Sequence, residues 1–161
     1  MSSDSANLAT TQAIYECFGK GDIPGHKIIF EITETAAIEG FSQAQHFIRQ
    51  IRRFGCKFTL DDFGVGYCSF TYLKNLKVDY LKIDGSFVKE IAASGIDESL
   101  VRSMRETSSF LGIKTIAEFV ENAETLAKLD EIGVDYAQGY FFGRPIPLEE
   151  ISLHGIKSQA A

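Results

Sequence analysis

Cysteine is scarce in this chain of 161 residues, which has only Cys17, Cys56 and Cys68. Three cysteines without C-x-x-C spacing supply neither a disulfide framework nor the ligands of a structural zinc site. Because disulfides are rare in reducing compartments, we expect three free thiols and a cytoplasmic protein.

Long apolar runs are also missing. No stretch approaches the roughly 20 apolar residues that a helix needs to cross a bilayer, and the polar start at residues 1–5 does not resemble a signal peptide. The sequence therefore predicts no membrane contact from this segment. Membrane anchoring would have to come from other domains of a parent protein.

Positive charge is in deficit, with 16 lysines and arginines against 22 aspartates and glutamates and a formal net charge of −6. Proteins that bind duplex nucleic acid usually present a basic face, so we expect no binding to duplex nucleic acid. A small anionic ligand would need local cations or metal ions.

The hydrophobic content is sufficient for one core. Hydrophobic residues make up 45% of the 161 residues, and this length does not require a second domain. We therefore expect a single domain over residues 1–161.

Five short β-branched or aromatic runs each end in a charged or amide residue. These runs cover residues 28–31, 58–62, 78–82, 115–118 and 134–138. Short apolar runs separated by helical segments are typical of parallel strands that helices cover. The carboxyl ends of barrel strands meet at one rim, so we expect their polar residues to face a single pocket.

Helical periodicity fills the intervals between these runs. Apolar residues recur at helical spacing over residues 8–18, 41–51 and 96–111 and again around 126–129. Gly55 follows the second segment and is expected to adopt the left-handed conformation that ends a helix. After residue 148 we expect a short terminal helix.

Four carboxylates stand at the ends of the predicted strands, namely Glu31, Asp61, Asp62 and Glu118. Any one of them alone would be expected to be solvated or to cap a helix. Together they would repel one another unless a divalent cation neutralised them, and hard oxygen ligands suit Mg²⁺ or Mn²⁺. An adjacent aspartate pair could bridge two ions about 3.5–4 Å apart, the arrangement used for in-line displacement at phosphorus.

A lysine and a glutamine complete the polar strand ends. An unpaired buried lysine is costly, so we expect Lys82 to face the carboxylates, where it would orient a water or stabilise phosphate charge. The alternative is a lysine that reaches solvent at the rim. Gln138 is expected to hydrogen-bond the water, the ligand or a carboxylate, or else to serve only as a structural partner of other polar groups.

Five segments of the chain resemble successive motifs of the EAL domain family, in the family's order. They are Phe30-Glu31-Ile32-Thr33-Glu34-Thr35, Leu60-Asp61-Asp62-Phe63-Gly64-Val65-Gly66-Tyr67, Asp79-Tyr80-Leu81-Lys82-Ile83-Asp84, Ile116-Ala117-Glu118-Phe119-Val120-Glu121 and Tyr136-Ala137-Gln138-Gly139-Tyr140. The resemblance covers roughly residues 8–148. One such motif would be a weak signal, but five in order are specific.

The resemblance implies a TIM-like barrel that hydrolyses the bacterial second messenger cyclic di-GMP to linear pGpG with two Mg²⁺ or Mn²⁺ ions. By position, Glu31 and Asp61 match ligands of the first metal. Asp61 also bridges to a second metal, which Asp62 and Glu118 hold as well.

The resemblance also implies roles for residues around the metals. Lys82 matches the lysine that contacts the hydrolytic water, and Gln138 the glutamine that helps to position it. Glu34 matches the glutamate that anchors the loop after the aspartate pair, a loop linked in the family to dimerisation and metal binding. Three residues look like ligand-side positions: Glu121, Arg144 and Pro145.

The chain also departs from the family. It lacks the Glu-Ala-Leu signature, the arginine that follows it and the asparagine on the next strand, which in the family supply two ligands of the first metal and a phosphate contact. Phe119 and Val65 stand where small residues are commoner, and we expect both to be tolerated. An eight-stranded barrel typically needs about 250 residues, so five strands fit here and three are missing.

The fold class that follows is α/β, a partial TIM-like (β/α) barrel with about five of the eight strands. We expect the chain to be a truncated EAL domain, its carboxy-terminal part, within a larger signalling protein. Five strands cannot close, and an open flank with two unpaired edges favours association. We therefore expect a homo-oligomer that covers the open side.

Three functions are compatible with these residues. The first is a fragment of a metal-dependent, cyclic di-GMP-specific phosphodiesterase whose isolated chain is inactive or weak, because two ligands of the first metal are missing. The second is a non-catalytic cyclic di-GMP receptor or a protein-interaction module, although the intact Asp61, Asp62, Lys82 and Glu118 favour an active parent. The third, argued without the family, is another metal-dependent barrel enzyme of the enolase type.

Overall fold

Five parallel strands form one sheet. The structure is a computed structural model, and it describes residues 14–16, 18, 24–66 and 70–147. In this part of the chain the strands follow one another across the sheet in chain order, and every neighbouring pair is parallel. They are β1 (Ile29–Thr33), β2 (Lys57–Phe63), β3 (Tyr80–Ile83), β4 (Lys114–Ala117) and β5 (Tyr136–Ala137). The prediction of a parallel α/β sheet is confirmed.

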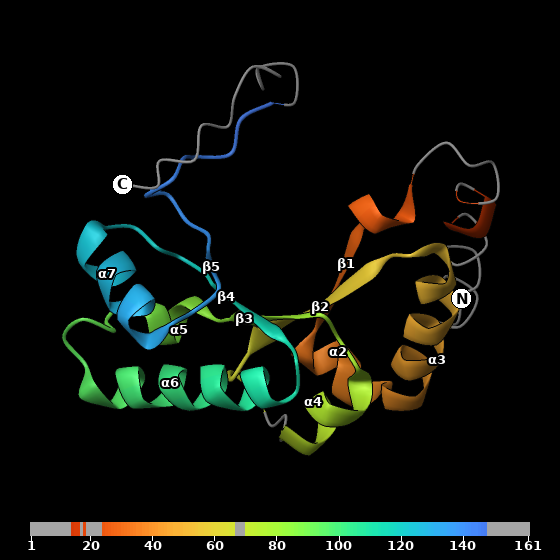
Figure 1. Ribbon diagram of the computed structural model, residues 1–161, viewed down its shortest axis with the longest axis horizontal. Coiled ribbons are helices and arrows are strands. Elements are labelled where there is room, and N and C mark those ends of the chain that lie inside the picture. The colour runs from red at the N-terminus through yellow and green to blue at the C-terminus, as the bar shows by residue number, and fades with distance from the viewer. Residues whose placement is uncertain (1–13, 17, 19–23, 67–69, 148–161) are drawn as a thin grey trace.

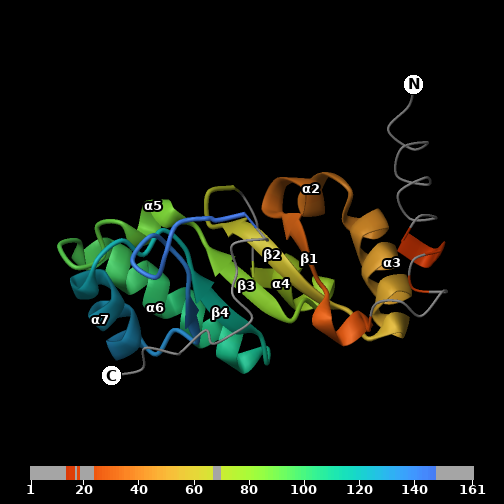
Figure 2. The same cartoon turned by 90° about the horizontal axis from the view of Figure 1, so that it is seen from above.

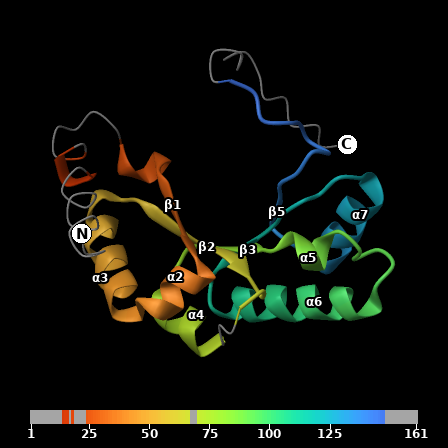
Figure 3. The same ribbon diagram turned by 180° about the vertical axis from the view of Figure 1, so that it is seen from behind.

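The longer helices lie along the outer side of the curved sheet (Figures 1 and 3). They are α3 (Phe41–Ile51), α4 (Phe70–Leu76), α6 (Gly95–Phe110) and α7 (Ala123–Ile132). The short helices α2 (Glu34–Glu39) and α5 (Gly85–Val88) instead lie at the edge where the strands end (Figure 2). The 3-10 turns η1 (Gly25–Lys27) and η2 (Arg52–Phe54) precede β1 and β2. Among the helices that the structure describes, none has the length and apolar character to span a bilayer.

Most predicted boundaries agree with the structure, and β1 shows an informative difference. The predicted strand ends at Glu31, but β1 continues to Thr33, because Ile32 and Thr33 stay in register with β2. The Thr33 hydroxyl oxygen then accepts a hydrogen bond from the backbone N–H of Ala36 and caps α2. Gly55 has φ +83° and follows η2, as predicted for a left-handed helix end. Most of the helix predicted over residues 8–18, and the tail after residue 148, fall outside the described residues.

Alternation along the strands separates an apolar face from a polar face. Phe58, Leu60, Leu81 and Ile83 are buried in the core between the sheet and the outer helices, and the Phe58 ring contacts that of Phe47 in α3. Burying each such side chain contributes about 1.5–3 kcal/mol. Because successive side chains point to opposite faces, the intervening residues of these strands face the inner side of the sheet.

The inner side of the sheet keeps apolar surface exposed. Ile29 at the start of β1 is 47% exposed and Tyr136 at the start of β5 is 46% exposed. Within the described ranges, β1 and β5 each have one strand neighbour only. This arrangement agrees with the expected open flank, while the expected association stays a prediction.

Candidate metal centre

Three carboxylates converge where β2 and β4 end. Asp61, Asp62 and Glu118 each offer one oxygen, and these oxygens all lie within 4.8 Å of one another. Asp61 and Asp62 belong to β2, and Glu118 follows β4 directly. The strand between them is β3, so the cluster spans three adjacent strand ends.

A bulge explains how two adjacent aspartates reach the same cluster. Regular alternation would send their side chains to opposite faces of the sheet. The β2–β3 register instead shifts between Leu60 and Phe63, and Asp62 adopts φ +56°. Aspartate is among the few non-glycine residues that enter this left-handed region readily, and bulges often occur beside functional sites. We expected from the sequence that the two aspartates share a site, but the sequence does not reveal the register shift and the left-handed backbone that bring them together.

Lys82 of β3 lies within this carboxylate group. Its Nζ is 2.8 Å from Oε1 of Glu118, 2.9 Å from Oδ1 of Asp61 and 3.6 Å from Oε2 of Glu31, and its side chain is only 8% exposed. The structure therefore places Lys82 against the carboxylates, as the sequence reading expected, and not in solvent at the rim.

The pKa values of Lys82 and Glu118 are both raised, for different reasons. Burial alone would lower the pKa of Lys82, but its hydrogen bonds to Glu118 and Asp61 outweigh burial and hold the pKa well above that of a free lysine. Burial raises the pKa of Glu118, and the negative charges of Asp61 and Asp62 act in the same direction, while the bond from Lys82 opposes them. Lys82 is therefore a permanent cation, and Glu118 holds a proton more readily than an ordinary glutamate.

Glu31 is on the same face but outside the tight cluster. It pairs with Thr59 in the sheet register, whereas the residue level with Asp61 is Thr33. The Glu31 side chain is 56% exposed and reaches Lys82 only at 3.6 Å. The structure thus brings Glu31 beside the cluster and leaves its carboxylate free to turn toward the open side.

Glu34 fixes the loop that follows the aspartate pair. The residue is 2% exposed, and its Oε2 accepts a hydrogen bond of 2.8 Å from the backbone N–H of Gly64. A Cβ at Gly66 would overlap Oε1 of Glu34, so any other residue there would have to displace this buried carboxylate. The anchoring role that the resemblance implied for Glu34 stays a prediction.

A small pocket of about 210 Å³ opens beside Glu118. Its other lining residues are Phe119, Glu121, Gln138, Gly139 and Tyr140. The backbone N–H of Gln138 donates to the carbonyl oxygen of Ala117 at the end of β4, and the residue is part of the pocket lining. Arg144 stacks on the Tyr140 ring at 4.9 Å, and Pro145 is exposed; neither residue lines the pocket.

Phe119 had no expected role in the site. This residue has φ +55°, an outlier for a bulky side chain, and it is 48% exposed next to Glu118. Its ring lies close to the backbone at Gly85 and 4.5 Å from Nζ of Lys89. The sequence shows only that a large residue stands where small residues are commoner. Residue size does not reveal the strained backbone.

The donor set fits a hard divalent cation. Carboxylate oxygens are the ligands that such ions prefer, and Asp61, Asp62 and Glu118 are close enough to share one ion. Lys82 now supplies the positive charge that separates two of these groups. A bound cation would therefore compete with Lys82 for the oxygens of Asp61 and Glu118.

Comparison with known sequences agrees with these motifs. The sequence profile of the EAL domain matches residues 2–145. The cyclic di-GMP phosphodiesterase PdeB of Shewanella oneidensis is 50% identical over 127 residues, which cover 79% of this chain and 15% of that protein. Cyclic di-GMP phosphodiesterase PdeA of Borreliella burgdorferi is 43% identical over 129 residues, 80% of this chain and 19% of that protein. The chain thus spans less than a fifth of each relative.

Comparison with solved structures supports the fold. The PaMucR phosphodiesterase in complex with c-di-GMP has a TM-score of 0.81 and 30% identity, covering 88% of this chain and 57% of that one. Klebsiella pneumoniae BlrP1 with manganese and the same nucleotide has a TM-score of 0.76 and 31% identity, covering 85% and 35%. The prediction of a partial TIM-like barrel is confirmed.

Proposed function

This chain belongs to the EAL domain family, and from that premise we propose that it forms part of a metal-dependent domain that hydrolyses cyclic di-GMP to linear pGpG. The observation that carries the proposal is the convergence of three carboxylate oxygens within 4.8 Å around a buried lysine. The names of its relatives and the nucleotide in its structural neighbours support the substrate.

Glu31 and Asp61 would supply oxygens to the first ion, and Asp61, Asp62 and Glu118 would hold the second. Mg²⁺ or Mn²⁺ suits these oxygens. Such ions, when bound, neutralise charge on the phosphate oxygens and make a bound water more acidic.

Lys82 would hold the attacking water. An ammonium group has three N–H donors, and two of them are directed to Glu118 and Asp61. The third can donate to the water oxygen, which leaves a lone pair of that oxygen free to attack phosphorus. Because the pKa of Lys82 is raised, this residue orients the water and does not act as the base.

The reaction forms one bond to phosphorus and breaks another. Linear pGpG keeps its phosphate on a 5′ oxygen, so the water oxygen bonds to phosphorus while the P–O3′ bond breaks and the 3′ oxygen gains a proton. In-line geometry requires the water and the leaving oxygen on opposite sides of phosphorus. Gln138 and Glu121, which share the pocket beside Glu118, would contact the water and the nucleotide there.

Chromatographic measurement of pGpG formation with Mn²⁺ tests the proposal. We expect slow formation by the unaltered chain, loss of it in Asp61→Asn, and no change in Asp130→Asn, which alters an exposed acid of α7. Tight, metal-independent nucleotide binding without turnover would support the receptor function instead. Absence of both binding and turnover would leave a protein-interaction module.

A further inference from the structure

A second, larger pocket lies at the opposite ends of the strands. It has a volume of about 600 Å³, within the range of small-molecule sites. Lys57, Tyr80, Lys114 and Tyr136, the first residues of β2 to β5, line it. The carboxylate cluster lies at the carboxyl ends of the same strands, so the two sites are separated by the length of the sheet.

The charge of this pocket contrasts with that of the chain. The lining includes four lysines, Lys57, Lys74, Lys77 and Lys114, in a protein of net charge −6. None of the four has a carboxylate within ion-pair distance in the part of the chain that the structure describes. A pocket with an excess of positive charge in its lining concentrates anionic ligands.

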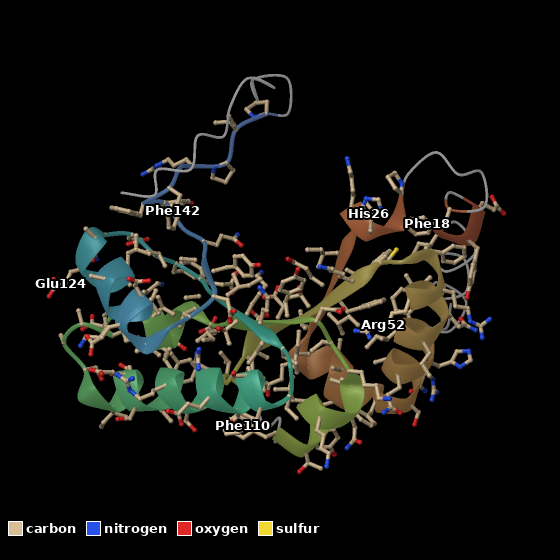
Figure 4. The ribbon with its side chains drawn as sticks, in the orientation of Figure 1. Phe18, His26, Arg52, Phe110, Glu124 and Phe142 are labelled. Carbon is tan, nitrogen blue, oxygen red and sulfur yellow. The ribbon has the colours of Figure 1, made fainter. Side chains whose placement is uncertain are left out.

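The acid in the lining, Asp79, pairs with Arg52 and forms no ion pair with these lysines, although its charge acts on Lys57. Its Oδ2 accepts a hydrogen bond of 2.8 Å from Nη2 of Arg52 and another of 2.9 Å from the backbone N–H of Phe58. Arg52, labelled in Figure 4, also donates to the carbonyl oxygen of Lys77. Asp79 and Arg52 thus pair with each other and hold the segment that carries Lys77.

Two of the lysines are held in position by tyrosine hydroxyls. Lys57 donates to Oη of Tyr80 at 3.0 Å, and Lys114 donates to Oη of Tyr136 at 3.3 Å. The two rings are neighbours, with centroids 6.1 Å apart. These bonds raise the pKa of Lys57 and of Lys114, so both remain cations at neutral pH. Lysines held in this way lose less side-chain entropy when an anion binds.

We propose that this pocket binds a small phosphorylated anion between Lys57 and Lys114 on the sheet and Lys74 and Lys77 on α4 and the loop after it. Each lysine offers a charge-assisted donor to phosphate oxygens, and the tyrosine hydroxyls are further donors. The site is independent of the proposed hydrolysis, because it shares no residue with the carboxylate cluster.

Calorimetric titration of the full chain with inorganic pyrophosphate, in the presence of EDTA, tests the site. Chelation removes divalent cations, so the carboxylate cluster would repel this probe. We expect binding to the unaltered chain and about tenfold or greater weakening in Lys74→Gln/Lys77→Gln. The control Lys27→Gln/Arg49→Gln removes the same charge from exposed positions outside the pocket and should bind as the unaltered chain does.

A second measurement needs no substitution. Pyrophosphate should slow the chemical acetylation of Lys57 and Lys114, read by mass spectrometry, and leave that of Lys27 unchanged. A parallel titration with guanosine diphosphate shows which groups the site recognises. Affinity equal to that of pyrophosphate means that the site recognises phosphate alone. Tighter binding means that it recognises a base as well. Equal weakening in both double variants, no protection of the two lysines, or tighter binding of an oligoglutamate peptide would overturn the proposal.

Discussion

The ammonium nitrogen of Lys82 lies 2.8 Å from Oε1 of Glu118. This ion pair joins the strand β3 to the segment after β4. Asp61 of β2 adds a second contact to the same nitrogen at 2.9 Å. Three neighbouring strand ends are therefore held together by a single cation. Substitutions in this group of residues should change both the free energy of unfolding and the affinity for a metal ion.

Replacing Lys82 by methionine should destabilise the chain by about 2 kcal/mol, since it leaves the carboxylates of Asp61 and Glu118 close together without a cation. The loss stays below the ~3–5 kcal/mol of fully buried pairs because both carboxylates keep some exposure. Denaturant unfolding measures it. Lys128→Met, which breaks surface pairs with Glu98 and Glu131, should cost much less, because solvent screens exposed ion pairs. Equal losses in the two variants would contradict the special role of Lys82.

Mn²⁺ should stabilise the chain through the carboxylate cluster. At a concentration 100 times its dissociation constant, a ligand of the folded state adds about 2.7 kcal/mol, which thermal unfolding detects. Asp62→Asn should abolish most of this gain, because Asp62 is in the cluster but forms no ion pair with Lys82. Glu124→Gln, in the first turn of α7 and outside the cluster, should keep the full gain. A gain of the same size in both variants would rule out this site.

Asp84 should stabilise the chain in a pH-dependent manner. Burial alone would raise the pKa of Asp84, but the hydrogen bonds from Ser86 and from the Gly85 backbone hold it below 3.8. A carboxyl group whose pKa is lowered by folding stabilises the folded state at pH values above its pKa in the unfolded state. This stabilisation is lost as the pH falls through the pKa of the folded state. Asp84→Ala removes the cap of α5 and should cost about 1 kcal/mol at neutral pH. The two proteins should converge in stability well below pH 3.8, and a difference independent of pH would refute the assignment.

Gly66→Ala should disturb the loop after the aspartate pair. The new Cβ would overlap the carboxylate of Glu34, which is buried and holds Gly64. Such overpacking costs about 1–3 kcal/mol, and it should also weaken Mn²⁺ binding by shifting Asp62. Gly95→Ala is the matched control, since a Cβ there meets no atom within 4 Å. If calorimetry finds the metal affinity unchanged while Gly66→Ala unfolds more easily, the loop does not support the metal site.

The chain should associate through its open inner side. Ile29 and Tyr136 are about half exposed there, at the two edges of the sheet. Light scattering at micromolar concentration should give a mass above that of one chain, and Ile29→Lys should lower it. Phe110→Lys is the control, because Phe110 is 93% exposed at the end of α6 on the outer side. A clean monomer for the unaltered chain would contradict this prediction.

Local signals were sufficient for much of the fold. Alternation and helical spacing are properties of consecutive residues, so β2, α3 and α6 could be predicted with small errors at their ends. The short helices α2, α4 and α5 were missed, because one or two turns carry too few apolar residues to show a period. The extension of β1 to Thr33 depends on pairing with β2, which is far away in the sequence.

The five strands, their polar carboxyl ends and the family motifs follow from residues that are adjacent or regularly spaced, so they can be recognised in the sequence. Which of those ends meet depends on how the strands pack. The left-handed Asp62 and the bulge in β2 bring two adjacent aspartates to one cluster, while Glu31 stays exposed beside it. The lysine pocket at the other ends of the strands is likewise invisible in the sequence, because its members are far apart in the chain and meet only when the strands lie in register.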